Sequence, residues 1–137
     1  MGSGHFRKVD SPKLSGIVNH QQNDSWKKER NKASIDSVKC TSRAKLLENS
    51  DFGDQIDYLS VDTEGSEFEI LSSIDFNRIQ IGIITVEHNY NEIKRESILT
   101  LLTRHGFTRV MQNISDHDDW YISQTLINRI KLPESTV

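Results

Sequence analysis

Apolar and polar positions follow a regular order in the second half of the chain. Residues 56–61 and 79–86 are apolar runs rich in β-branched side chains, a composition typical of β-strands. The second run is apolar on both faces, which indicates a buried strand of a parallel sheet. Residues 107–111 and 120–123 predict two further short strands. These two lie too close together for a crossover, so they should form an antiparallel hairpin.

Helical spacing of apolar residues separates these strands. Ser66 followed by Glu69 is a capping box that predicts a short helix. Asn89 is expected to cap a longer helix that ends at Gly106, the position where glycine commonly terminates a helix. The residues of this helix expected to face the sheet are Ile93, Ile98, Leu99, Leu101 and Leu102. Alternating strands and helices predict an open α/β sheet with parallel strands that ends in an antiparallel hairpin.

The first half of the chain has fewer apolar residues than the second. Residues 1–50 contain 14 residues of the types AVILMFWYC, whereas residues 56–110 contain 22. A segment with less apolar surface to bury offsets less of its ordering entropy. We therefore predict three regions: a poorly ordered or weakly structured segment 1–37, an α/β region 38–130 and a tail 131–137. Weaker signals predict strands at 8–18 and 34–40 and a helix at 41–48.

Composition limits the class of protein. A chain of 137 residues has room for one domain. Its net charge of −3 gives no electrostatic footprint for nucleic acid, and no apolar run approaches the roughly 20 residues of a membrane span. No secretion signal is visible, and the single cysteine, Cys40, fits a reducing compartment. We expect a cytoplasmic protein that binds neither nucleic acid nor membrane.

Acidic residues gather where the first two strands end. Residues 62–69, DTEGSEFE, carry four carboxylates, and residues 87–89, EHN, follow the second strand. Parallel strands end at one edge of a sheet, so Asp62 and Glu87 should face a common pocket. Together with Asn89 they offer hard oxygen donors suited to Mg²⁺. The alternative is local, because acidic residues also stabilise the positive amino terminus of a helix.

Two further groups of residues could take part in chemistry. His88 could act as a general base, or it could be a hydrogen-bonded residue at a strand end. Asp119 and Trp120 could line an acceptor pocket, the aromatic ring for stacking and the carboxylate for hydroxyl groups. Trp120 could equally be a core residue.

Three strings of the sequence together resemble a known family. IDYLSVDTEGSEFEIL, IITVEHNYN and DDWYIS are similar, in this order and spacing, to the carboxy-terminal half of FkbM-type methyltransferases. The resemblance is dense from about Val38 to Ser123. It implies a doubly wound, Rossmann-like fold and an S-adenosylmethionine-dependent O-methyltransferase. The acceptor it implies is a hydroxyl of a small molecule or glycan. From their place at the strand ends, we expect the catalytic residues to be Asp62, Glu64, Glu87 and His88.

One element of such enzymes is not found in this sequence. They hold the cofactor with a glycine-rich turn after the first strand, but Gly2 and Gly4 have no strand before them and no helix after them. The resemblance therefore implies a partial sheet without the amino-terminal cofactor-binding strands, and binding of S-adenosylmethionine by this chain alone is in question. The strand at 56–61 would then have an open edge. We expect a homo-oligomer, pairing with a separately encoded amino-terminal half, or an amino-terminal segment that folds back over this edge. The alternative function is a non-catalytic remnant or assembly module.

Overall fold

The computed structural model describes residues 2–8, 16–17, 34–40, 53–88 and 90–130. The chain divides into two units, Met1–Asp51 with Thr63–Glu67, and Phe52–Asp62 with Phe68–Val137. The predicted helix at 41–48, the tail at 131–137 and Asn89 lie outside the described residues.

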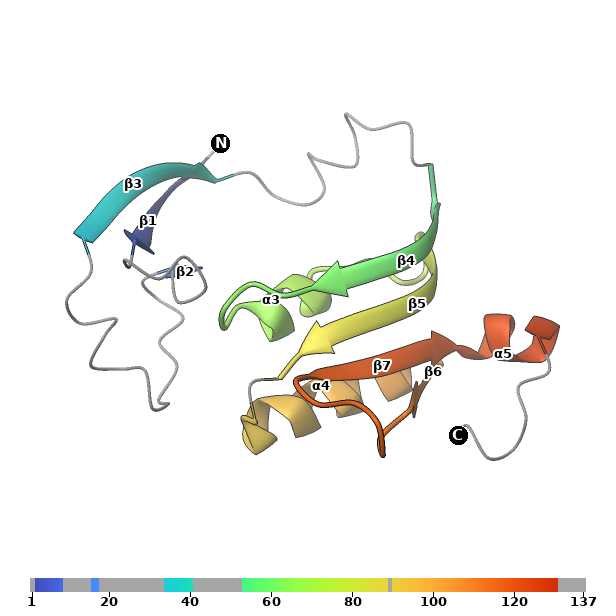
Figure 1. The fold of residues 1–137 in the computed structure, drawn as a ribbon. Helices are drawn as coiled ribbons and strands as arrows, with labels where there is room; N and C mark the ends of the chain where they lie inside the picture. The colour runs from blue at the N-terminus through green and yellow to red at the C-terminus, as the bar shows by residue number, and fades with distance from the viewer. Residues whose placement is uncertain (1, 9–15, 18–33, 41–52, 89, 131–137) are drawn as a thin grey trace. The chain divides into compact units, whose positions relative to one another are not determined.

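The first unit contains a small antiparallel sheet. Strand β1 (Gly2–Lys8) pairs with β2 (Gly16–Ile17) on one side and β3 (Ser34–Cys40) on the other (Figure 1). The strand predicted at 34–40 is confirmed. Of the strand predicted at 8–18, Lys8 belongs to β1 and Gly16–Ile17 to β2, and the other residues lie outside the described ones. The predicted boundary after residue 37 falls inside β3, and the three predicted regions stay a prediction.

Gly2 and Gly4 lie inside a strand of this sheet. Gly4 is opposite Val38 of β3 and Gly2 is opposite Cys40. Both glycines therefore belong to a regular antiparallel ladder. This agrees with the interpretation that they do not form a cofactor-binding turn.

The second unit is built on a mixed four-stranded sheet in the order β4-β5-β7-β6 (Figure 1). Its strands are β4 (Gln55–Val61), β5 (Gln80–Glu87), β6 (Phe107–Val110) and β7 (Asp118–Ser123). β4 and β5 are parallel, and β6 and β7 form the predicted antiparallel hairpin. β7 is also antiparallel to β5, so β5 and β6 run in the same direction with β7 between them. The predicted α/β class is thus confirmed. That the chain lacks the amino-terminal cofactor-binding strands of the complete fold stays a prediction.

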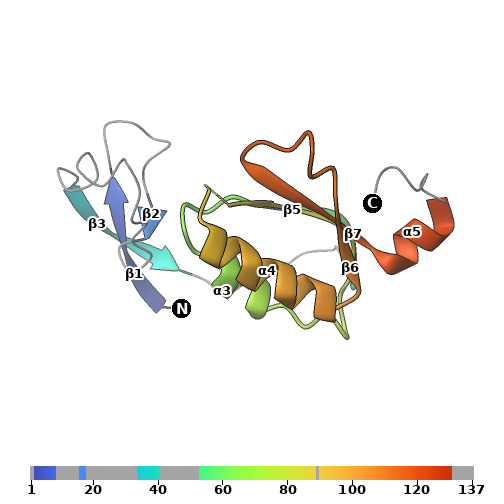
Figure 2. The ribbon, with the colours of Figure 1, turned by 90° about the horizontal axis from the view of Figure 1, so that it is seen from below.

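Three helices accompany this sheet among the described residues: α3 (Glu67–Ser72), α4 (Glu92–Arg104) and α5 (Gln124–Ile130). Figure 2 shows α3 and α4 on the same face of the sheet. The core between these layers consists of fully buried side chains, the largest being Tyr121, Leu71, Ile84, Leu102, Val86 and Val110. None of the described helices has the length and apolar character needed to cross a membrane.

The sequence predicted the carboxyl end of α4 correctly but not its amino-terminal cap. Gly106 follows the last turn with φ +79° and donates its N–H to Thr103 O, so the predicted stop is confirmed. The amino-terminal cap is Asn91, whose side chain accepts a hydrogen bond from Lys94 N. The prediction that Asn89 caps this helix is therefore wrong. Ile93, expected to face the sheet, is 82% exposed.

The open edge expected at residues 56–61 is present in the described sheet. β4 is a terminal strand of the order β4-β5-β7-β6, and β5 is its only partner among the described residues. Tyr58 near its middle is 53% exposed, and its hydroxyl is hydrogen-bonded to Thr85 Oγ1 at 2.8 Å. Within the described part of the chain, no strand pairs with the backbone groups on the outer side of β4.

Candidate functional site

Asp62 and Glu87 lie side by side at the carboxyl ends of β4 and β5. The parallel register pairs Val61 with Val86, so the next residue of each strand stands at the same level. Each carboxylate offers one oxygen, and these oxygens lie within 4.8 Å of each other. Asp62 is exposed and Glu87 is half-buried, so solvent or a ligand can reach the pair. The predicted convergence of these two residues is confirmed, and their chemical role stays a prediction.

The turn that follows Asp62 is organised by a buried carboxylate. Glu67 is 3% exposed, and its Oε1 accepts hydrogen bonds from Gly65 N at 2.8 Å and from Thr63 N and Oγ1 at 3.1 Å each. Ser66 Oγ donates to Thr63 Oγ1. Glu64, one of the predicted catalytic residues, lies within this turn and has a positive φ of 54°. Glu67 thus fixes the backbone that carries Glu64, a role that the sequence analysis missed.

His88 directly follows β5 and is buried, with 5% of its surface exposed. Its Nδ1 accepts a hydrogen bond from Tyr90 N at 3.1 Å, so the ring proton is assigned to Nε2. Nε2 is buried and has no hydrogen-bond partner among the described residues. Burial, followed by the positive charge of Arg95, lowers the pKa of His88 below 6.5. The ring is neutral at pH 7 with no free lone pair, which favours the strand-end alternative over the general base.

Asp119 is held in a buried ion-pair network. Its carboxylate is 3% exposed and receives two hydrogen bonds of 2.8 Å from Arg95 of α4. Arg109 of β6 and the Tyr121 hydroxyl each approach the same carboxylate at 3.5 Å. The sequence analysis identified neither arginine, because no local pattern links residue 95 or 109 to residue 119. Their shared contact with Asp119 joins helix α4 to strands β6 and β7.

The charges of this network shift the pKa values of its members. Burial alone would raise the pKa of Asp119, but the hydrogen bonds and positive charge of Arg95 outweigh burial and lower it. The same hydrogen bonds raise the pKa of Arg95. Burial and then the charge of Asp119 raise the pKa of Tyr121 well above its ordinary value. Asp119 is therefore ionised at neutral pH and Tyr121 is protonated.

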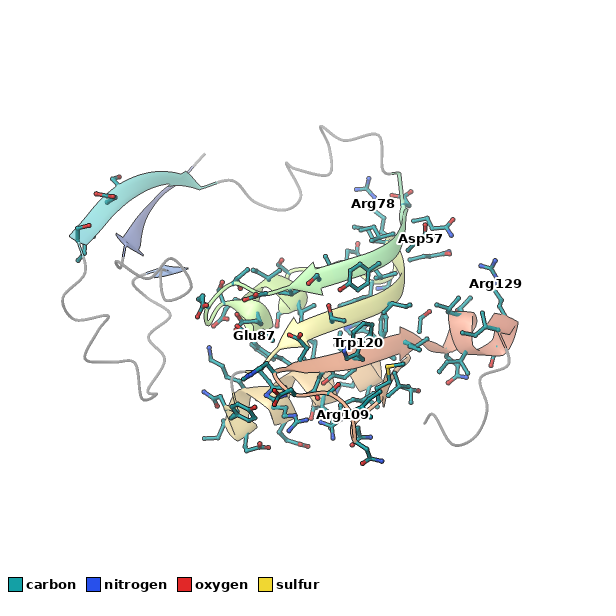
Figure 3. All side chains as sticks on the ribbon, in the orientation of Figure 1. Asp57, Arg78, Glu87, Arg109, Trp120 and Arg129 are labelled. Atoms are coloured by element: carbon teal, nitrogen blue, oxygen red, sulfur yellow. The ribbon has the colours of Figure 1, made fainter. Side chains whose placement is uncertain are left out.

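The strand register separates Asp119 from Trp120. Successive residues of a strand point to opposite faces, and Arg95 of α4 places Asp119 on the face that the helices cover. Trp120 is opposite Thr85 and Asp118 is opposite Glu87, so these residues share the other face. Figure 3 shows Glu87 and Trp120 on neighbouring strands. The structure brings half-buried Trp120 to the same face as Glu87 and does not bring Asp119 there.

Acidic residues at the carboxyl ends of adjacent parallel strands define a ligand-binding edge of an α/β domain. The model of the Methyltransferase FkbM domain matches residues 4–120, and the chain belongs to this family. The match begins well before Val38, where the dense part of the resemblance starts. No curated protein and no solved structure matches the chain.

Proposed function

We propose that the chain is the acceptor-side part of an S-adenosylmethionine-dependent O-methyltransferase. Members of its family generally use this cofactor. The observation that carries the proposal is the approach of Asp62 and Glu87 to within 4.8 Å at the sheet edge. In the reaction the methyl group passes from the sulfonium of the cofactor to a hydroxyl oxygen of the acceptor. The hydroxyl proton is released to solvent water, and S-adenosylhomocysteine leaves.

A divalent cation fits the donors at this edge. Asp62 and Glu87 provide carboxylate oxygens, and Asn89, two residues on, provides an amide oxygen by sequence. Mg²⁺ prefers oxygen ligands and keeps several waters, so one or two carboxylates are enough to hold it. A bound cation would orient the acceptor hydroxyl and lower its pKa. Some related small-molecule O-methyltransferases, the catechol type among them, use carboxylates at these two strand ends in this way.

The face that carries Glu87 also supplies groups that could bind an acceptor. Trp120 lies two residues along β7 from Asp118, which is opposite Glu87 of β5. An aromatic ring stacks on the apolar face of a sugar or small molecule, while carboxylates accept hydrogen bonds from its hydroxyl groups. Asp119 does not support this role, because Arg95 already occupies its carboxylate. The acceptor class we propose is a small molecule or glycan with a free hydroxyl.

The second candidate is a non-catalytic remnant or assembly module in the cytoplasm. The observation that favours it is the outer edge of β4, which has no strand partner among the described residues. A second copy of the chain or a separately encoded amino-terminal half could add a strand there. Of these two, only a separately encoded amino-terminal half would also supply the glycine-rich turn that the sequence of this chain does not contain.

Calorimetric titration with S-adenosylhomocysteine, with and without Mg²⁺, separates the two candidates. The methyltransferase proposal expects binding at micromolar strength. The double variant Asp62→Asn/Glu87→Gln should lose any dependence of binding on Mg²⁺, whereas Asp57→Asn, an exposed residue within β4, should behave as the parent. Lack of binding under all conditions would contradict the methyltransferase proposal for this chain and leave the assembly module.

A further inference from the structure

An exposed groove runs along helices α3 and α4. Its volume is about 670 Å³, and it is lined by Phe68 of α3 together with Glu92, Ile93, Glu96, Ser97, Thr100, Leu101 and Arg104 of α4. The buried residues of α4, Ile98 and Leu102, point to the sheet. The groove therefore lies on the side of α4 that does not pack into the core. Neither Asp62 nor Glu87, the carboxylates at the sheet edge, lines this groove.

Two parallel rows of side chains form the α4 side of this groove. Residues four apart on a helix line up as ridges. One ridge is Ile93, Ser97 and Leu101, which is apolar apart from a small hydroxyl in its middle. Ile93 is 82% exposed, so most of its apolar surface is open to a partner. The ridge thus offers an apolar contact surface whose central residue, Ser97, has a smaller side chain than its two neighbours.

The neighbouring ridge has opposite charges at its two ends. It reads Glu92, Glu96, Thr100 and Arg104, acidic near the amino terminus of α4 and basic near the carboxyl terminus. Arg104 makes no ion pair with the described part of the chain. A helix with this pattern is complementary to an identical helix that runs in the opposite direction. Antiparallel packing would place Glu92 and Glu96 of each copy near Arg104 of the other.

We propose that the α3–α4 groove binds a second copy of this chain, with the two α4 helices packed antiparallel across a twofold axis near Ser97 and Thr100. Small residues near the crossing point let the helices approach closely, so that Ile93 and Leu101 of both copies fill the groove. Each Arg104 then pairs with the acidic end of the opposite α4. Because the patch is a single helix face, we expect a weak dimer that depends on protein concentration.

Sedimentation velocity over a range of protein concentrations tests the contact. The parent chain should shift toward the dimer as concentration rises to roughly millimolar. Ile93→Asp should remain monomeric over the same range. The matched control is Ile114→Asp, because Ile114 is 78% exposed in the turn between β6 and β7, outside the groove. Circular dichroism checks that both variants are folded.

A charge exchange tests the antiparallel arrangement itself. Glu92→Arg would oppose Arg104 across the dimer, and Arg104→Glu would oppose Glu92, so each variant alone should lose the dimer at least tenfold in affinity. An equimolar mixture of the two variants should regain it, since each contact then joins opposite charges. A monomeric parent chain would overturn the proposal. So would a dimer that survives Ile93→Asp, because association would then use another surface such as the β4 edge.

Discussion

The guanidinium of Arg95 and the carboxylate of Asp119 meet in a two-point contact, with both hydrogen bonds 2.8 Å long. The two residues are 24 positions apart and belong to different layers of the second unit. The arginine side chain is 22% exposed, whereas the carboxylate is 3% exposed. The contact therefore neutralises a charge that the core of the domain could not otherwise hold.

Removing this arginine should destabilise the domain strongly. Arg95→Met leaves Asp119 buried with only the more distant Arg109 and Tyr121 hydroxyl, and loss of one partner of a buried pair costs about 3–5 kcal/mol. Urea denaturation measures the change in the free energy of unfolding. The matched control is Arg78→Met, whose pair with Asp54 is 71% and 64% exposed and should contribute no more than about 1 kcal/mol. Equal losses in the two variants would contradict the interpretation of Asp119 as a buried charge.

The turn that follows β4 should depend on Glu67. Glu67→Ala would leave the N–H groups of Thr63 and Gly65 without their acceptor, at a cost of about 1–3 kcal/mol in unfolding free energy. Glu96→Ala removes an exposed carboxylate from helix α4 and should change stability by less than about 0.5 kcal/mol. Thermal and urea unfolding of the two variants give the comparison. A larger loss for Glu96→Ala would refute the assigned role of Glu67.

His88 should make the fold sensitive to mild acid. Burial and Arg95 lower its pKa in the folded state, so the unfolded chain, with an ordinary value of 6.5, binds the proton first. Unfolding then takes up a proton, and stability should fall as the pH drops through 6.5 toward the lowered value. His88→Asn keeps an acceptor for Tyr90 N but does not titrate. The melting temperature of this variant should fall less between pH 7 and mild acid, and parallel curves for variant and parent would count against the prediction.

Gly82 should be required for a different reason from Gly106. A Cβ atom on Gly82 would lie 2.8 Å from Asp57 O on the neighbouring strand, and overpacking of this kind costs about 1–3 kcal/mol. Gly106 has open space around it, and its positive φ is the difficulty. Asn tolerates a positive φ, so Gly106→Asn should be milder than Gly106→Ala. Gly82→Asn should be no milder than Gly82→Ala, and chemical denaturation of the four variants checks both statements.

Mg²⁺ should stabilise the chain if the sheet edge holds a cation. A ligand that binds only the folded state raises stability by about 2.7 kcal/mol when its concentration is one hundred times its dissociation constant. The melting temperature should therefore rise with Mg²⁺, and Asp62→Asn/Glu87→Gln should abolish the rise. Asp57→Asn, which removes one exposed carboxylate from β4, serves as the control. A rise that persists in the double variant would place the cation elsewhere.

The sequence was most informative where one local rule decides the structure. The apolar run of β5 and the glycine after α4 each specify an element, and both were predicted within one or two residues. The pairing of Asp62 with Glu87 followed from the parallel direction of their strands. These predictions needed no knowledge of distant contacts, because periodicity and strand direction determine them.

The rest depended on contacts between distant residues. Asn89 and Asn91 are both good helix caps, and only the backbone geometry at Asn91 distinguishes them. Ile93 fits the apolar periodicity of α4, but it belongs to the first turn and lies beyond the covered part of the helix. Asp119 and Trp120 suit one pocket by their chemistry, and the sequence predicts a strand only from Trp120 onward. β7 starts at Asp118, and the alternation of an extended strand then separates the two side chains.

The place of β7 in the sheet also determines when, during synthesis, the four strands can pair into one sheet. β5 and β6 are not hydrogen-bonded to each other, because β7, which follows both in the sequence, lies between them. A nascent chain that has emerged only as far as β6 therefore holds the β4–β5 pair and the lone strand β6, without the strand that joins them. We expect chains that end before Asp118 to be targets for chaperones and proteases, since β7 joins this pair and β6 into one layer.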